Sequence, residues 1–399
     1  MAKLLKVAAI CFMLVFTSLA DARDFDLSID LRAVSSDAPQ SRLTGGLGTT
    51  RFGENDKGVQ LGLARLGYHG DLHDTLSLTA EAVSYGERSR PVLDLTEAYM
   101  EWRPIPASAW RSIVKLGAFY PEISLENRMR GWRSPYTLSS SAINTWVGEE
   151  LRTIGAEYSL DWLGRKLGHD FDAGISAAVF GWNDPAGTII ADRGWGLHDQ
   201  ESTLFGHYGK SPDESTLFYD DMDKRAGFHT SLNVNYRGWL ELNGLHYDNR
   251  ADSSIYSAAI KDVAWKTHFN SIGLRYTPTE QLTAIWQRLY GRTYAGGPPT
   301  PNCWQFGSWF GLVSWKSEAN RYSARYDHFT MNQLVSGWGF YDHQQGHALT
   351  LAYTHQFNQN WNLVAEGMQV NNRLLSHQSI GLPVATRERQ LQLALRYEL

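Results

Sequence analysis

The feature that most constrains this chain is a period of two in hydrophobicity. Between Phe25 and Arg32 apolar residues alternate with polar ones, and the same alternation returns between Leu391 and Leu399. This period predicts strands with one apolar and one polar face. Segments of about ten residues, the length that a tilted strand needs to cross a bilayer, recur along the chain.

We predict sixteen such strands. They lie at 24–34, 59–68, 75–85, 92–102, 110–119, 150–160, 170–181, 226–237, 239–248, 268–277, 281–290, 304–315, 321–330, 346–357, 361–371 and 387–399.

The connections between these strands alternate in length. Connections from even to odd strands are short: 70–74, 104–109, 237–238, 278–280, 316–320 and 358–360. Connections from odd to even strands are long: 35–58, 120–149, 182–225, 249–267, 331–345 and 372–386. Long loops at every second connection are typical of outer-membrane barrels, with short periplasmic turns and long extracellular loops.

The predicted fold is therefore all-β, a transmembrane antiparallel β-barrel. Hydrocarbon cannot hydrogen-bond a backbone amide, so strands cross a membrane only in a closed sheet. The 15 Trp, 19 Tyr and 16 Phe fit this fold, because aromatic side chains gather where the membrane meets water. A repeat of Glu-Ser-Thr-Leu-Phe at 201–205 and 214–218 favours an extracellular hairpin, with two further strands, eighteen in all, as the alternative.

The first 22 residues have the layout of a secretory signal peptide. Lys3 and Lys6 precede an apolar run at 7–16, and Ala20-Asp21-Ala22 forms a cleavage site. A helical membrane anchor is the alternative. Residues 23–399 then form a single barrel domain, exported to the outer membrane of a Gram-negative bacterium, in which no apolar stretch reaches the roughly 18 residues of a membrane helix.

Composition excludes several other classes. The net charge of −5 argues against a nucleic-acid partner, which requires a basic surface. Two cysteines are too few for a disulfide scaffold or a four-cysteine zinc module, and Cys303 lies alone in a predicted loop.

Two segments carry a family likeness. Residues 93–102 read Leu-Asp-Leu-Thr-Glu-Ala-Tyr-Met-Glu-Trp, and residues 115–119 read Lys-Leu-Gly-Ala-Phe, followed by Pro121 and by Ser-Leu-Glu at 124–126. With these motifs the chain resembles the porins of Gram-negative outer membranes, in particular the sixteen-stranded phosphate-selective type. It departs from them in ending Tyr397-Glu398-Leu399 rather than on an aromatic residue, and in lacking a lysine ladder.

The resemblance implies a water-filled lumen and a third long loop, at about 120–149, that folds inward and narrows it. Charges of both signs on this loop would filter solutes by size and dipole. The alternative is a surface loop whose arginines pair with its own carboxylates. The candidate constriction residues are Glu122, Glu126, Arg128, Arg130, Trp132, Arg133 and Tyr136.

Polar residues opposite the apolar strand positions should face water in the lumen. These candidate wall residues are Asp30, Arg32, Glu97, Glu157, Arg275, Arg325, Glu366 and Arg396.

We find no catalytic motif and predict no cofactor and no metal. The pairs His69/His73 and His343/His347 fall in predicted turns or loops, where solvated histidines are expected. Asp220, Asp221 and Asp223 form an acidic loop, with calcium binding as the alternative.

The predicted function is that of a porin through which small hydrophilic solutes or ions diffuse passively. The alternatives are a polysaccharide exporter of the alginate-export type, a barrel enzyme such as an outer-membrane lipase, and a non-conducting structural or adhesive barrel. Expected partners are outer-membrane lipid, the solutes or ions and the barrel-assembly machinery. Porins often trimerise, so a homotrimer is a further option.

Overall fold

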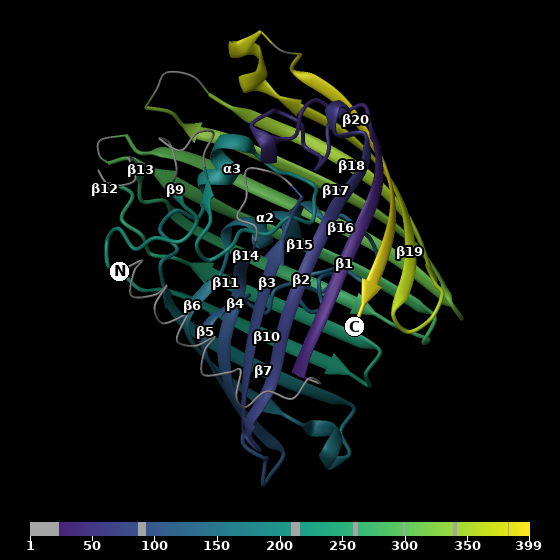
Figure 1. Cartoon of the computed structure of the whole chain (residues 1–399). Coiled ribbons are helices and arrows are strands. Elements are labelled where there is room, and N and C mark those ends of the chain that lie inside the picture. The colour runs from purple at the N-terminus through teal and green to yellow at the C-terminus, as the bar shows by residue number, and fades with distance from the viewer. Residues whose placement is uncertain are drawn as a thin grey trace.

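The computed structural model describes residues 24–86, 93–208, 216–257, 262–297, 300–337, 341–381 and 383–399. The predicted signal peptide lies outside this part of the chain. Sixteen antiparallel strands close into a barrel in which each strand pairs with its neighbours along the chain, and β20 pairs with β1 (Figure 1). Within the described residues no helix has the length and apolarity needed to cross a bilayer.

Each element has the following bounds. The barrel strands are β1 (Phe25–Ser36), β2 (Gly58–His73), β3 (Leu76–Ser84), β4 (Asp94–Trp102), β5 (Trp110–Phe119), β6 (Thr153–Trp162), β7 (Phe171–Gly181), β10 (Gly227–Tyr236), β11 (Leu240–Asp248), β14 (Lys266–Tyr276), β15 (Leu282–Ala295), β16 (Asn302–Ser317), β17 (Asn320–Val335), β18 (His343–Gln356), β19 (Trp361–Leu374) and β20 (Ala385–Glu398). The loops contain the helices α2 (Ala142–Glu150) and α3 (Thr188–Arg193), the pair β8 (His207–Tyr208) and β9 (Thr216–Leu217), the pair β12 (Tyr256–Ser257) and β13 (Asp262–Val263), and 3-10 turns at Arg42–Thr44, Glu54–Asp56, Gly164–Leu167 and Leu375–Ile380.

The prediction of a sixteen-stranded barrel is confirmed, and the alternative of eighteen strands is wrong. The repeat does not add barrel strands. Its second copy contains β9, which pairs with β8 in a separate two-stranded sheet. The first copy precedes β8 and forms no strand, so the predicted hairpin exists with a shifted first arm.

Strand length differs between the two sides of the barrel. The strands β3 to β7 have 9 to 11 residues, whereas β15 to β20 have 14 to 16. The sequence underestimated the longer strands at their long-loop ends, so the predicted loop at 331–345 shrinks to 336–342. Cross-strand pairing continues there although the outward residues become polar, and a search for apolar alternation therefore misses it.

The barrel reverses the usual distribution of side chains. On β20, Leu391, Leu393 and Leu395 are exposed, while the alternate residues Gln390 and Gln392 are buried. Rings gather on the outer face near the short-turn end, where Trp361 packs on Tyr397 with centroids 4.9 Å apart. An apolar outer band bordered by aromatic rings matches the hydrocarbon of a bilayer.

An apolar core lies inside the barrel as well. Residues of α2 and α3 join inward-facing residues of β14 to β19 in one buried cluster, in which Trp146, Phe269 and Phe306 are in contact. Figure 1 shows both helices within the ring of strands. The loops that follow β5 and β7 therefore occupy part of the barrel interior.

Candidate functional site

The segment 120–149, called the constriction loop below, leaves β5 and turns into the barrel. It ends in α2, where Ser141 caps the helix by accepting a hydrogen bond from the Asn144 amide. All nine residues of α2 are buried. The Trp146 ring lies 5.3 Å from that of Phe269 and 5.0 Å from that of Phe306, centroid to centroid. Burial of these rings against β14 and β16 fixes the end of the loop to one side of the barrel.

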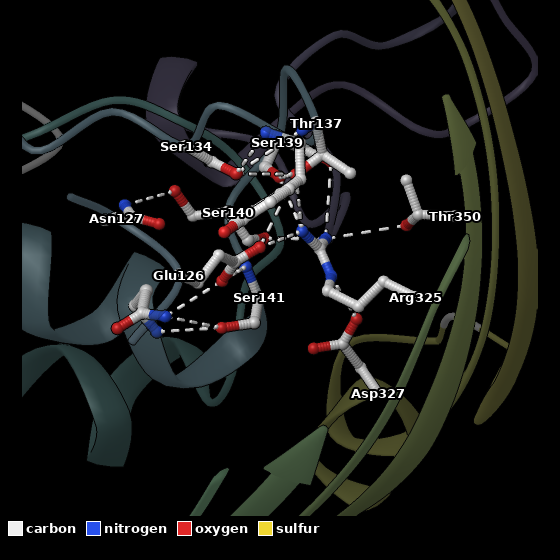
Figure 2. A network of polar contacts seen from close by, with 12 residues as sticks. Glu126, Asn127, Ser134, Thr137, Ser139, Ser140, Ser141, Arg325, Asp327 and Thr350 are labelled. Atoms are coloured by element: carbon white, nitrogen blue, oxygen red, sulfur yellow. Dashed lines mark hydrogen bonds and ion pairs between the residues drawn. The ribbon is translucent and has the colours of Figure 1, made fainter. Parts of the chain in front are cut away.

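A buried arginine on β17 holds the middle of the constriction loop (Figure 2). Arg325 donates to Glu126 of the loop at 2.6 Å and to Asp327 of its own strand at 2.8 Å. Its other donors reach the carbonyls of Ser139 and Ser140 at 2.6 and 2.9 Å. The three side chains of this ion-pair cluster are fully buried.

The acceptors around Arg325 have further partners in the loop. Glu126 also accepts from the Ser141 amide at 3.0 Å and from Asn144 Nδ2 at 2.8 Å. Glu366 of β19 accepts from the Leu138 amide at 2.6 Å. Wall carboxylates thus accept hydrogen bonds from loop amides, and the wall arginine donates hydrogen bonds to loop carbonyls. The wall therefore binds both the donors and the acceptors of the loop backbone.

Two other long loops reach inward, which the sequence did not predict. Asp199, in the loop after β7, accepts from Arg32 of β1 at 2.5 Å and from Arg51 at 2.8 Å. These arginines hold the pKa of Asp199 below its usual value despite its burial. In the loop after β1, the Thr49 amide donates to Glu388 of β20 at 2.8 Å. Together with the constriction loop, these two loops form what we call the plug.

A cavity of about 690 Å³ remains beside the constriction loop, toward the short-turn end. We call it the vestibule. Residues of β3 to β6, β10 and β11 and the loop segment from Tyr120 to Trp132 line it. Its charged lining residues are Glu81, Glu97, Glu101, Glu122, Asp161 and Glu241 against Arg103, Arg111, Lys115, Arg128 and Arg130, with His69 in addition. The numbers of acidic and basic lining residues are therefore nearly equal.

The vestibule charges are paired across its width. Arg128 of the loop binds Glu241 of β11, and Arg130 binds Asp26 of β1 at 2.6 Å. On the wall, Lys115 binds Glu122 at 2.7 Å. The side chains of the two loop arginines remain 39% and 57% exposed, so both ion pairs are accessible from the vestibule.

The tip of the constriction loop lies close against the wall. Gly131 and Trp132 both have positive φ angles, 64° and 47°. A Cβ atom on Gly131 would come within 2.4 Å of Arg65 Cδ, so only glycine fits this approach. The tip therefore presents Arg130 and Trp132 to the vestibule.

A buried cluster stands next to the vestibule. Trp132 stacks on Tyr120 with centroids 4.1 Å apart, and the Arg152 guanidinium lies 3.4 Å from the Tyr120 ring centre. The Tyr120 hydroxyl donates to Glu201, whose pKa burial raises to about 8. Glu201 belongs to the loop after β7, so this cluster joins the constriction loop to the rest of the plug.

Protonation of Glu150 makes the stability of the packed plug depend on pH. Its carboxyl accepts from the Gly187 and Ile189 amides at 3.1 and 2.6 Å, and burial raises its pKa to about 8. A raised folded-state pKa stabilises the packed plug fully below the usual glutamate pKa of 4.5, and this contribution is lost as pH rises through about 8. We expect the plug to loosen over this range.

The measurement is open-channel noise in planar bilayers between about pH 5 and pH 9, a window that starts above the usual glutamate pKa and includes the raised pKa of Glu150. Noise should rise several-fold in the native protein and much less in Glu150→Gln. Glu122→Gln is the control, since Lys115 holds the pKa of Glu122 below its usual value and Glu122 stays ionised in this window. A Glu150→Gln variant with the native pH response would contradict the assignment.

The structure divides the predicted constriction residues into a vestibule group, a buried group and Arg133. Glu122, Arg128, Arg130 and Trp132 line the vestibule. Glu126 and Tyr136 are buried, so the expectation that they face the passage is wrong: Glu126 neutralises Arg325, and Tyr136 packs under Arg321. Arg133 is 10% exposed and binds Glu398 at 2.7 Å.

The predicted wall residues all lie on barrel strands, but few of them contact water. Glu97 lines the vestibule, and Arg275 is partly exposed, 4.0 Å from Glu241. The expectation of water contact is wrong for the residues that the plug or a neighbouring side chain covers. These buried residues are Asp30, Arg32, Glu157, Arg325, Glu366 and Arg396.

Several vestibule residues were not predicted. Arg111 and Lys115 alternate on β5, Asp161 lies on β6 and Glu241 on β11. Arg111 binds Asp161 at 2.7 Å. Each occupies a polar position of its strand, so consistent use of the alternation would have found them.

The histidines, aspartates and Cys303 also differ from expectation. His69 lies on β2, and His343 and His347 lie on β18, rather than in turns or loops; Cys303 is buried on β16. His69 lies near Asp26 and Glu81, but Arg65 binds both carboxylates. Asp221 and Asp223 cluster with Asp184 rather than with Asp220, and burial raises the pKa of Asp184 to about 6.

Comparisons with known proteins find similar structures but no similar sequences. No protein-family model matches the chain, and no curated protein sequence matches it. Among solved structures, the outer-membrane channel DcaP of Acinetobacter baumannii is similar with a TM-score of 0.56 at 9% identity, over 94% of this chain and 96% of that one. OmpF of Salmonella typhi, solved with daunomycin, gives 0.53 at 12% identity over 94% and 97%. The fold is that of an outer-membrane porin.

A third porin-fold neighbour is the anion-selective porin from Comamonas acidovorans, with a TM-score of 0.50 at 13% identity over 94% and 98% of the two chains. The similarity covers nearly the whole of each of these neighbours. At these identities the porin fold is shared, while the side chains that line the vestibule are this chain's own.

Proposed function

We propose that the chain is an outer-membrane porin through which small hydrophilic solutes or ions diffuse passively. The observation that carries this proposal is the vestibule, a cavity with paired charges on its walls inside a closed barrel with an apolar outer face. Water and ions are stable in such a cavity and not in the surrounding hydrocarbon. The balanced charge favours weak ion selectivity.

Planar bilayers provide the test. Purified, refolded protein should insert and give discrete conductance steps in potassium chloride. Larger neutral polymers added to the bath should leave the conductance unchanged once they are too wide to enter the vestibule, and smaller ones should lower it. A correctly folded barrel that inserts without opening ion-permeable steps would overturn the proposal.

Two alternatives find less support. An exporter for anionic polysaccharide would have an arginine-rich lumen, whereas acidic and basic residues share this vestibule. A lipase would need a serine–histidine pair on the outer face. Among the outward histidines, His246, His343 and His347 instead contact Asn270, Asn332 and Asn371. His268 and His328 stack on Tyr294 and Trp309. We therefore propose a channel rather than an enzyme.

The remaining predictions are part of the same proposal. Export by a cleaved signal peptide at residues 1–22, insertion by the barrel-assembly machinery and a homotrimeric state are expected of a porin in the outer membrane of a Gram-negative bacterium. Mass spectrometry of the mature N-terminus would test the first of these predictions.

A further inference from the structure

Five arginines stand on the outer face of the barrel, on the side with the long strands. They are Arg288 and Arg292 of β15, Arg373 of β19, and Arg387 and Arg389 of β20, and all five are exposed. We call them the outer arginine belt. No carboxylate is among the outward-facing residues of β15 to β20, although the chain as a whole carries a net charge of −5.

Cross-strand register shows that these arginines share one face. Arg387 pairs with Asn371, Asn371 with His347, and His347 with His328. The row continues through Trp309 to Arg288. Directly paired residues project from the same side of a sheet, so a single row of outward polar and aromatic groups joins both ends of the belt.

The β19 and β20 end of the belt lies at a defined height. Tyr397 is one of the aromatic residues at the short-turn end, and Arg387 precedes it by about ten residues. At 3.3 Å per residue and a strand tilt near 40°, ten residues rise roughly 25 Å along the barrel axis. This distance equals the height of the apolar band of an outer-membrane barrel. Arg373, Arg387 and Arg389 therefore lie near the level where hydrocarbon ends, at the headgroups of the outer leaflet.

The belt arginines differ from the interior arginines in their partners. Arg32, Arg65 and Arg325 inside the barrel each bind carboxylates. The ion pairs among the described residues include none of the five belt arginines. Within the described part of the chain, the side chains of Arg387 and Arg389 donate to neutral amides, at 3.1 Å to Asn371 and 3.3 Å to Gln369. Asp37 beside them accepts from the Arg389 backbone amide.

We propose that the outer arginine belt binds the phosphate groups of a phosphorylated glycolipid in the outer leaflet. Guanidinium groups match phosphate in geometry and charge, and neighbouring asparagine, glutamine and histidine side chains can bond the sugar hydroxyls. A second copy docked through the same face would bring arginine against arginine, so the charge favours lipid over self-association. This inference rests on the proposed location in the outer membrane but not on conduction.

The test uses the full mature chain in detergent micelles and native mass spectrometry, with diphosphoryl lipid A as the probe. The variant combines Arg373→Gln, Arg387→Gln and Arg389→Gln. Each basic residue near an anionic lipid surface contributes about fivefold to affinity, so the triple variant should bind lipid A roughly 100-fold more weakly. Dephosphorylated lipid A should bind the native protein as weakly.

The control variant combines Arg103→Gln, Arg165→Gln and Arg237→Gln, which removes as many exposed cations from the short-turn end. It should keep native affinity within about twofold, since the lost charges lie far from the lipid phosphates. A shift in gel mobility on heating verifies the barrel in every variant, and conductance should not change in the belt variant. Equal affinity for both lipids, equal binding by belt and control variants, or loss of an oligomer in the belt variant would overturn the proposal.

Discussion

Replacement of Arg325 by methionine should detach the middle of the constriction loop and raise single-channel conductance. The substitution keeps a long side chain but leaves Glu126 and Asp327 as buried carboxylates without their cation. Breaking a buried ion pair from one side costs about 3–5 kcal/mol, because the remaining charge has no compensation. The loop can avoid this cost by moving Glu126 into water, which pulls residues 120–141 away from the wall.

The measurements are unitary conductance and open-channel noise, with limited proteolysis of the loop as a second readout. Arg321→Met is the matched control on the same strand, since Arg321 contacts the Tyr136 ring and Ser314 but no carboxylate. Adding Glu126→Gln and Asp327→Asn to Arg325→Met should restore part of the native behaviour by neutralising both acids. If Arg325→Met conducts with native size and noise, Arg325 does not hold the loop.

Reversal of charge at Arg128 and Arg130 should convert weak selectivity into clear cation preference. Each substitution by glutamate changes the vestibule by two charge units and leaves Glu241 or Asp26 facing another carboxylate. Six acidic residues already line this cavity against five basic ones, so the double variant becomes strongly acidic. Arg133 is omitted from this experiment because it is largely buried against Glu398.

The reversal potential across a potassium chloride gradient measures this effect. At about 0.1 M salt, where the screening length is near 10 Å, the permeability ratio of potassium to chloride should rise several-fold. At about 1 M, where that length is near 3 Å, most of the change should vanish. Arg225→Glu, an exposed residue in a long loop outside the vestibule, is the control. An unchanged reversal potential in the double variant would show that the loop does not border the ion path.

The barrel could be predicted from the sequence because its cause is local. Each strand must place apolar residues outward, and the pattern from Phe25 to Leu31 or from Leu391 to Leu395 shows this directly. The alternation of short and long connections then indicated an outer-membrane barrel. The predicted strands ended too early where outward residues turn polar, as at Asn332 of β17, two residues beyond the predicted end, because hydrogen bonding between strands does not require an apolar face.

The site was predictable only in outline. The inward course of the segment 120–149 followed from a resemblance, but which of its charges face water depends on partners far away in sequence. Glu126 meets Arg325 and Arg133 meets Glu398, and no spacing in the sequence joins them. The roles of the loops around Thr49 and Asp199 were missed for the same reason, since their contacts exist only after the barrel has closed.

The apolar cluster around Trp146 has a consequence for the order of assembly. Its members come from α2 and from strands more than a hundred residues later, such as β14 and β16, so they cannot meet before the wall is complete. The barrel must first form with water in its interior. The loops then pack against one side of the wall and displace this water. Tryptophan emission should therefore shift to shorter wavelength in two kinetic phases during refolding into detergent, the second arising from Trp146 as water leaves the interior.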